Sequence, residues 1–390
     1  MSHSRSVHIP NVNFSYQEKE WRWLNMFLAL RELKYAKGRY FLIGLIMVLV
    51  AWLTFMVSGL ANGLSSDNAS ILKNMDADYF VLQTDSEHKL TRSALGTEKL
   101  EEVRQLEGLS QSEPLGQTML SVYRNDSKKK IDIALFGIEP SGKVMPSITE
   151  GKSMGASNEV VVDSSLKEQG VQIGDTLGDQ ELGIEWKVVG FATNQKFSHT
   201  PVAFMDIQNF NKLMQASFGK QTASYNAIVI HTDKLNKESL QKSVADTEVI
   251  TKKEAVQGIP GFKEEQGSLT MMIAFLIVIA AFIQAVFFYV ITLQKISQFG
   301  VLKAIGAKTS YLAANLVGQV LLLAIVAVAI SIGLTFGVSA ILPASMPFEL
   351  GVNILSQYSG LLILVSIIGA LLSLNRIAKV DAIEAIGRVE

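Results

Sequence analysis

The stretch 260–272 combines residue types that could bind a small molecule. Glu264 and Glu265 stand directly before a long apolar run, and Met271 and Met272 follow about one or two helical turns into that run. Methionine sulfur and carboxylate oxygen can each bind iron, and the flexible methionine side chain adapts to irregular apolar shapes. One interpretation is therefore a site for a flat apolar ligand that carries an acidic or metal-bearing group.

A different interpretation of the same stretch needs no ligand. The charged residues would mark the amphipathic start of a helix, and the methionines would serve as adaptable packing. Met47 and Met56, in an earlier apolar run, could add thioethers to a ligand site, and Gly44 and Gly59 would permit close contact between helices there. The residues alone leave both interpretations open.

A second stretch, 292–308, is the only place between two long apolar runs where lysines occur. Its apolar residues recur at intervals of about three to four, which is typical of one face of a helix. They are Leu293, Ile296, Phe299, Val301, Leu302 and Ile305, and the other face carries Lys295 and Lys303. This pattern predicts an amphipathic helix that lies flat at the membrane and docks in a groove of a partner.

The same stretch has some letters of a phosphate-binding loop but not its spacing. A loop of the G-x-x-x-x-G-K type needs its lysine directly after the second glycine. Here five residues separate Gly300 from Gly306, and Ala307 precedes Lys308. Nucleotide binding by this chain is therefore not expected, and ATP, if it is used, belongs to another subunit.

Other chemistry has little support in the sequence. The histidines, His3, His8, His88, His199 and His231, are scattered, and none has the H-E-x-x-H spacing of a zinc site. The chain has no cysteine, which excludes disulfides and thiolate ligands. We expect no serine nucleophile elbow of the G-x-S-x-G type and no proton relay within the apolar runs. The chain is therefore predicted not to be an enzyme and to hold no metal of its own.

Four apolar runs are each long enough to cross a bilayer. They predict a membrane protein with four transmembrane α-helices and a large α+β extracellular domain inserted between the first and second spans. We expect a cytoplasmic amphipathic helix at 1–39, spans at 40–64, 266–293, 311–342 and 351–374, an extracellular domain at 65–265, a cytoplasmic helix at 294–310, an extracellular loop at 343–350 and a cytoplasmic tail at 375–390.

The net charge of −1 conceals two oppositely charged portions. Residues 67–265 hold about 22 Lys and Arg against about 29 Asp and Glu, whereas the remainder holds about 13 against about 7. Because basic segments beside membrane spans stay inside the cell, both termini are expected in the cytoplasm and the acidic portion outside. Contact with membrane lipid is expected, and a nucleic-acid partner is not.

Short strand-like runs alternate with turn residues in the acidic portion. They lie at 78–83, 119–124, 131–137, 159–163, 186–191, 202–205 and 227–231, and helical segments are expected at 97–105, 206–216 and 236–245. The pattern predicts an α+β domain in which helices pack on mostly antiparallel strands.

Residues 299–308, F-G-V-L-K-A-I-G-A-K, follow one large outer domain and precede two more spans. In this position they resemble the signature of the FtsX-like permeases, the macrolide-exporter type of ABC transporter subunit. The closing segment 376–386, R-I-A-K-V-D-A-I-E-A-I, is similar to that family's terminal cytoplasmic segment. The family usually has a charged residue where Ser297 and Gln298 stand, which leaves the polar half of a docking contact open.

The short outer domain and the K-E-E-Q-G sequence at 263–267 look like the haem-export permeases of Gram-positive bacteria. This resemblance implies a homodimer in the plasma membrane that works with two copies of a separate ATPase, which binds ATP and Mg²⁺. The chain itself would hold no cofactor, and haem would be its substrate. The haem-binding residues would be Glu264, Glu265, Met271, Met272, Met47 and Met56. The ATPase-coupling residues would be Phe299, Gly300, Leu302, Lys303, Ile305 and Gly306.

Alternative functions share the same span arrangement. The transporter could export a peptide antibiotic or a lipid. Alternatively, the permease could transmit the motion of the ATPase to an outer enzyme or sensor without moving a substrate through itself. A membrane-anchored sensor or adhesion domain without an ATPase is a third possibility. That last class would not need an amphipathic helix between its spans.

Overall fold

The computed structural model describes residues 37–378, except 126, 128, 180–182, 219–223, 233–235 and 344–345. These residues form two compact units, which are described separately. The helical unit comprises the described parts of Met1–Gly59, Met271–Met346 and Leu350–Glu390, and the α+β unit comprises Leu60–Thr270 with Pro347–Glu349. The amphipathic helix expected at 1–39 and the tail expected at 375–390 lie almost wholly outside the described residues.

Among the described residues, four helices are long and apolar enough to cross a membrane. They are α2 (Lys37–Asn74), α7 (Phe262–Gln294), α9 (Thr309–Ser339) and α10 (Val352–Ala378). The short helix α8 (Ile296–Ala304) lies between α7 and α9. α2 continues beyond the apolar run that ends at residue 64, because its last turns bury Ile71 and Leu72 in the core of the α+β unit.

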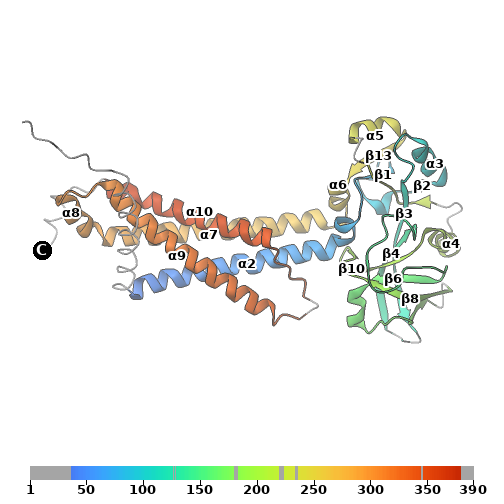
Figure 1. Cartoon of the computed structure of the whole chain (residues 1–390), viewed down its shortest axis with the longest axis horizontal. Coiled ribbons are helices and arrows are strands. Elements are labelled where there is room, and N and C mark those ends of the chain that lie inside the picture. The colour runs from blue at the N-terminus through green and yellow to red at the C-terminus, as the bar shows by residue number, and fades with distance from the viewer. Residues whose placement is uncertain are drawn as a thin grey trace, which may run out of the picture. The chain divides into compact units, whose positions relative to one another are not determined.

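The long helices of the helical unit run alongside one another in a bundle (Figure 1). One buried cluster of this bundle includes Phe288, Val320, Ala324 and Ala370. Gly369 lies at a close crossing, where an added Cβ would be 3.4 Å from the backbone nitrogen of Ala285. A hydrogen bond of 2.8 Å from Ser331 Oγ to the carbonyl of Val48 ties α9 to α2. Small and hydroxyl side chains are typical of contacts between membrane helices.

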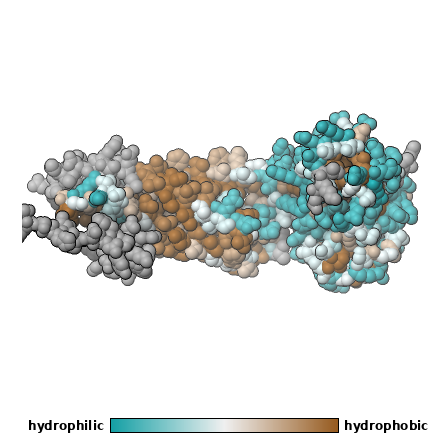
Figure 2. Space-filling view, turned by 45° about the horizontal axis from the view of Figure 1, so that its top comes forward, coloured by the Kyte–Doolittle hydropathy of each residue, from teal (hydrophilic) through white to brown (hydrophobic). Residues whose placement is uncertain are grey.

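The outer surface of the bundle is also apolar. Figure 2 shows hydrophobic side chains over the long helices and mostly hydrophilic ones over the α+β unit. Phe275, Phe282 and Val286 of α7 are exposed, as are Ile325 and Ile330 of α9. An exposed apolar surface of this extent is costly in water but suits the hydrocarbon of a bilayer.

The α+β unit is built on one mixed sheet with a small two-stranded sheet beside it. The strands are β1 (Tyr79–Gln83), β2 (Leu95–Gly96), β3 (Glu113–Arg124), β4 (Lys130–Ile138), β5 (Ile148–Gly151), β6 (Glu159–Asp163), β7 (Thr176–Asp179), β8 (Ile184–Ala192), β9 (Lys196–Phe197), β10 (Thr200–Asp206), β11 (Ser224–Tyr225), β12 (Ala227–Ile230) and β13 (Thr247–Thr251). The main sheet has the order β13-β1-β12-β3-β4-β10-β6-β8-β5. β4 and β10 pair in parallel, as do β6 and β8, and the other pairs are antiparallel.

Helices cover both faces of this sheet because successive strand residues point to opposite sides. In β1, Val81 belongs to the buried cluster on one face, and Phe80 and Leu82 belong to the cluster on the other. The first cluster includes residues of α3 (Thr97–Gln105), α4 (Ile207–Phe218) and α5 (Lys237–Ser243). The second includes the end of α2 and residues of α6 (Lys252–Gln257). The predicted α+β class is confirmed.

Each strand segment expected from the sequence overlaps an observed strand, and the three expected helical segments coincide with α3, α4 and α5. The sequence pattern does not mark β2, β5, β7, β9, β11 or β13. Most of these strands have two to four residues, which is too short for an alternation of apolar and polar side chains to be visible.

Candidate functional site

The helix α8 is shorter than the amphipathic helix expected at 292–308. It has nine residues and ends in a tight turn at Gly306, whose φ is +100°. The turn is held by hydrogen bonds from Gly306 N to Lys303 O at 3.0 Å and from Ala307 N to Leu302 O at 2.9 Å. This is the Schellman arrangement, in which glycine takes the left-handed position because it has no Cβ. The helix therefore stops at residue 304, before the apolar pattern does.

The expected apolar stripe divides into two faces. Phe299 is 5% exposed and packs with Leu312 and Leu316 of α9, whereas Ile305 in the closing turn is 77% exposed. Leu302 is also exposed. Phe299 consequently attaches α8 to its own chain, whereas Leu302 and Ile305 are accessible, as are Val301 at 50% and Leu293 at 40% exposure. Spacing alone does not distinguish these roles, since all of these side chains are apolar.

The other expected coupling residues support this arrangement. Gly300 is buried, and Lys303 is half-buried on α8. Ser297 and Gln298 are exposed at the start of the helix. The accessible part of this segment therefore presents two uncharged polar side chains near one end and the apolar side chains of Val301, Leu302 and Ile305 near the other.

The acidic pair before the second span lies in the first turn of α7. Glu264 is exposed, and Glu265 is half-buried. Glu264 precedes Met271 by seven residues, and Glu265 precedes Met272 by the same number, so both carboxylates and both thioethers lie on one face of the helix. That face has polar oxygen at one end and sulfur about 10 Å further along, at a rise of about 1.5 Å per residue.

Glu265 also belongs to a polar network within the α+β unit. Asn68 Nδ2 donates to Glu265 Oε2 at 2.8 Å, and His199 Nε2 lies 3.3 Å from the same oxygen. The other ring nitrogen of His199 lies 3.4 Å from Asp67 Oδ2, and Lys196 pairs with Asp67. The β9–β10 turn thus inserts an imidazole between a carboxylate of α2 and one of α7. No spacing in the sequence indicates this network, because its members come from three distant segments.

The four methionines expected at a ligand site lie on two helices, α2 and α7. Met271 and Met272 are exposed on α7, and Met56 is half-buried on α2. Met47 is 4% exposed and belongs to the buried cluster that contains Phe288. Since Phe288 lies 16 residues beyond Met272 on α7, about 24 Å separates the level of Met47 from that of Met272. The expectation that Met47 joins the outer pair within one chain is therefore wrong.

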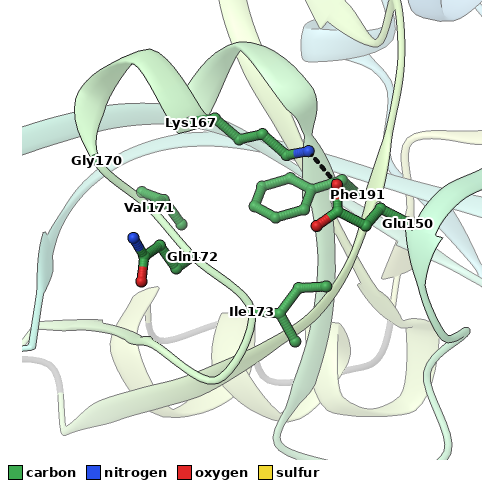
Figure 3. A pocket seen from close by; sticks show the side chains of 7 residues that line it. All are labelled: Glu150, Lys167, Gly170, Val171, Gln172, Ile173 and Phe191. Atoms are coloured by element: carbon green, nitrogen blue, oxygen red, sulfur yellow. Dashed lines mark hydrogen bonds and ion pairs between the residues drawn. The ribbon is translucent and has the colours of Figure 1, made fainter.

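A hollow of about 440 Å³ opens on the α+β unit (Figure 3). It is lined by Glu150, Lys167, Gly170, Val171, Gln172, Ile173 and Phe191. Lys167 forms an ion pair with Glu150, and its ammonium lies 4.5 Å from the centre of the Phe191 ring. Because the two charged groups neutralise each other, the hollow offers neither a free acid nor a free base for catalysis.

Glu113 and His231 lie in contact with each other, both side chains buried, elsewhere in the α+β unit. His231 Nε2 lies 3.2 Å from Glu113 Oε1, and the backbone amides of Lys143 and Val144 donate to the two carboxylate oxygens at 2.7 and 3.3 Å. Burial raises the pKa of Glu113, but the hydrogen bonds from His231 and the two amides outweigh it, so the pKa lies below its usual value. With both oxygens engaged, Glu113 organises the loop after β4.

Residues 151–155 read G-K-S-M-G, so the letters of the serine nucleophile pattern do occur, contrary to the expectation from the sequence. A nucleophile elbow places its serine on a sharp turn from a strand into a helix. Ser153 is exposed in the loop between β5 and β6, and a strand follows it.

Within the described residues, no group of three or more His, Asp or Glu side chains is placed to hold a metal ion.

Two family models match the chain. Residues 41–247 match the MacB-like periplasmic core domain, and residues 270–382 match the FtsX-like permease C-terminal domain. The chain belongs to the FtsX-like ABC transporter permeases, multi-pass membrane proteins with an α+β core domain between their first and second spans. It is a transport subunit and not an enzyme, because the ATPase of these transporters is a separate subunit.

Curated relatives extend the match over nearly the whole chain. A protein of Staphylococcus haemolyticus that carries the name of a hemin transport system permease, HrtB, is 31% identical over 94% of this chain and 100% of its own length. The protein of the same name from Staphylococcus epidermidis is 30% identical over 93% of this chain and 99% of its own. An uncharacterised ABC transporter permease of Mycobacterium tuberculosis is 24% identical over 93% of this chain and 99% of its own.

Solved structures match about half of the chain. The periplasmic region of MacB from Actinobacillus actinomycetemcomitans matches 48% of this chain and 95% of its own, with 13% identity and a TM-score of 0.37. The extracellular domain of YknZ from Gram-positive bacteria matches 45% of this chain and 99% of its own, with 14% identity and a TM-score of 0.32.

Proposed function

We propose that this chain is the permease subunit of an exporter that removes haem from the plasma membrane of a Gram-positive bacterium. The proposal is supported by the similarity of 31% over 94% of the chain to a staphylococcal protein named for hemin transport. In the proposed orientation both termini are cytoplasmic and the acidic α+β domain is outside, in accordance with the distribution of charge. ATP and Mg²⁺ are bound by the partner ATPase, and this chain carries no cofactor.

The working unit in this proposal is a homodimer of the permease with two ATPase copies. Leu302 and Ile305 form the apolar anchor in a groove of the ATPase, and Lys303 supplies a nearby charge. Phe299 holds α8 against α9, Gly300 is buried beside it, and Gly306 shapes the turn that exposes Ile305. Closure of the ATPase pair on ATP then moves α8 between two packed states.

The proposed haem site lies on the outer half of α7. Haem is a flat apolar molecule with two carboxylates and a central iron, and it needs an apolar surface with one or two iron ligands. The face of α7 that carries Glu264, Glu265, Met271 and Met272 offers carboxylate and thioether ligands beside exposed apolar side chains. Met56 could extend this surface from α2, and Met47 does not take part.

The test of this function is haem binding by the purified permease. We expect added haem to acquire the absorbance of a protein-bound species, and we expect the combined variant Glu264→Gln, Glu265→Gln, Met271→Leu and Met272→Leu to bind it at least about tenfold more weakly. Both kinds of substitution keep side-chain volume, so the helix should remain intact.

A matched control changes the same residue types elsewhere. Glu107→Gln and Met119→Leu alter an exposed glutamate and an exposed methionine of the α+β unit, and they should leave haem binding unchanged. Haem absorbance that survives the combined replacement on α7 would exclude this face as the site. Stimulation of ATP hydrolysis by a peptide antibiotic or a lipid, and not by haem, would favour the alternative cargo.

A further inference from the structure

Lys295 occupies the corner between α7 and α8, and its side chain is turned into the helical unit. The residue is 9% exposed, its Nζ donates to Gln319 Oε1 at 3.0 Å, and its ammonium lies 5.7 Å from the centre of the Tyr40 ring. A lysine at the end of a membrane-spanning helix commonly extends to water, because burial of its charge is costly. The inward position of Lys295 therefore indicates a role within the helical unit, because a lysine that only anchors a helix at the membrane surface would extend to water.

Gln319 of α9 receives this lysine in a single side-chain orientation. The residue is 2% exposed. Its Oε1 accepts from Tyr40 OH and from Lys295 Nζ, both at 3.0 Å, and its Nε2 donates to Asn315 Oδ1 at 3.2 Å. If the amide were turned over, its NH₂ group would face the ammonium, which cannot accept a hydrogen bond. The contacts thus hold Tyr40, Lys295 and Gln319 as one group, called here the inner node.

The inner node joins three helical elements. Tyr40 lies in the first turns of α2, Lys295 directly precedes α8, and Gln319 belongs to α9. α8 has a second attachment to α9, where Phe299 packs with Leu316. Since Leu316 and Gln319 are three residues apart, both attachments use the same face of α9. α8 is therefore held on α9 at two points and is connected to α2 through the node.

We propose that the inner node is the positioning element that passes the motion of α8 to α2. This inference rests on the proposed function, in which a partner ATPase moves α8. With α8 held at two points, displacement of α8 carries Lys295 and Gln319 together, and the hydrogen bond and the cation–π contact carry Tyr40 with them. α2 continues without a break from Tyr40 to Asn74, so a displacement of its first turns is passed along the helix.

The first test measures coupling in the permease–ATPase complex in lipid vesicles. Lys295→Met and Gln319→Leu should leave ATPase co-purification and basal ATP hydrolysis unchanged, while haem transported per ATP falls about tenfold, within the range typical of coupling between sites. Tyr40→Phe loses the hydroxyl but keeps the ring, so its haem transported per ATP should lie between that of these variants and that of the wild type. Lys308→Met changes an exposed lysine outside the node and should keep the wild-type ratio.

A second test is independent of the transported substrate. Because the chain has no cysteine, spin labels can be placed at Leu42→Cys on α2 and Ala304→Cys on α8, both of which are exposed. In the protein with an intact node, the distance between the two spin labels should have one narrow distribution with and without ATP, because α2 follows α8. Lys295→Met or Gln319→Leu should broaden this distribution.

Unchanged distance distributions together with an unchanged transport ratio would overturn the proposal. If Lys295→Met does not give folded protein, Tyr40→Phe, which removes one oxygen atom, makes the same comparison. A wild-type complex that hydrolyses ATP but moves no haem would refute the haem proposal. In that case the distance measurement still decides whether α2 follows α8 through the node.

Discussion

Glu254 closes a capping box at the start of α6, the last helix before α7. Thr251 Oγ1 accepts from Glu254 N at 3.2 Å, Glu254 Oε2 accepts from Thr251 N at 2.8 Å, and Lys237 Nζ lies 2.6 Å from Glu254 Oε1. Burial raises the pKa of Glu254, but the hydrogen bonds from Lys237 and Thr251 outweigh it and lower the pKa to about 2. A carboxyl whose pKa is depressed on folding stabilises the fold above its unfolded pKa.

This stabilisation should be present above pH 4.5, the ordinary pKa of the group, and should be lost as the pH falls toward about 2. Glu254→Gln should remove it, with a cost of about 0.5 to 2 kcal/mol to the local stability of α6, the usual range for loss of a cap. Hydrogen-exchange protection of the α6 amides in the full chain, corrected for intrinsic rates, measures both effects. Glu238→Gln, at an exposed site on α5, is the control. Equal protection in Glu254→Gln and wild type would contradict the assignment.

At the scale of the element, α8 has an inward face and an outward end with different roles. Phe299 fills a buried cluster with two α9 residues, whereas Ile305 is exposed by the Gly306 turn that stops the helix. An exposed isoleucine next to an exposed leucine at a helix end is a surface that a protein groove can bury. The division follows from the direction in which each side chain leaves the helix, and it leaves Val301, Leu302 and Ile305 exposed.

Leu302→Asp and Ile305→Asp should each weaken capture of the ATPase subunit by at least about tenfold, because a charge would replace a buried apolar contact. Co-purification of the ATPase with the permease from membranes measures this. Ile341→Asp places the same charge at an exposed isoleucine beyond α9 and should not affect capture. If both α8 variants retained the ATPase and its coupling to transport, the anchor would have to lie elsewhere.

At the scale of the whole molecule, the two units have surfaces suited to different surroundings. The bundle exposes apolar side chains on its outside, and the α+β unit is hydrophilic outside and holds two apolar clusters against the two faces of its sheet (Figure 2). One chain thus combines a lipid-facing part with a water-facing domain between its first and second spans. This is the arrangement of the FtsX-like ABC transporter permeases, to which the chain belongs.

Deletion of the gene should make the host bacterium grow poorly at haem concentrations that the parent strain tolerates. Plasmid-borne wild type should restore growth, and a copy with Ile305→Asp should not, because the permease would be uncoupled from its ATPase. Growth curves with graded haem measure this. Unaltered haem tolerance, accompanied by sensitivity to a membrane-active peptide, would indicate the alternative cargo.

Much of the fold could be predicted because it depends on local properties of the chain. The length of each apolar run indicates a span, and the alternation of side chains in segments such as 131–137 indicates a strand. The local pattern of 292–308 does not separate the roles of its residues, because Leu302 and Phe299 are both apolar and lie three residues apart on a helix. Which of them packs on α9 depends on a contact with Leu316 that the local pattern does not contain.

By itself, the sequence determined the number and order of the spans and the acidic and basic portions, since hydropathy and charge are summed over neighbouring residues. Only the tertiary structure decided that Glu265 meets Asn68 and His199, and that Lys295 meets Gln319. Helix rotation is the physical reason. One residue turns a helix by about 100°, and a helix that is apolar all round, like α7, gives no sequence signal for which side faces the core.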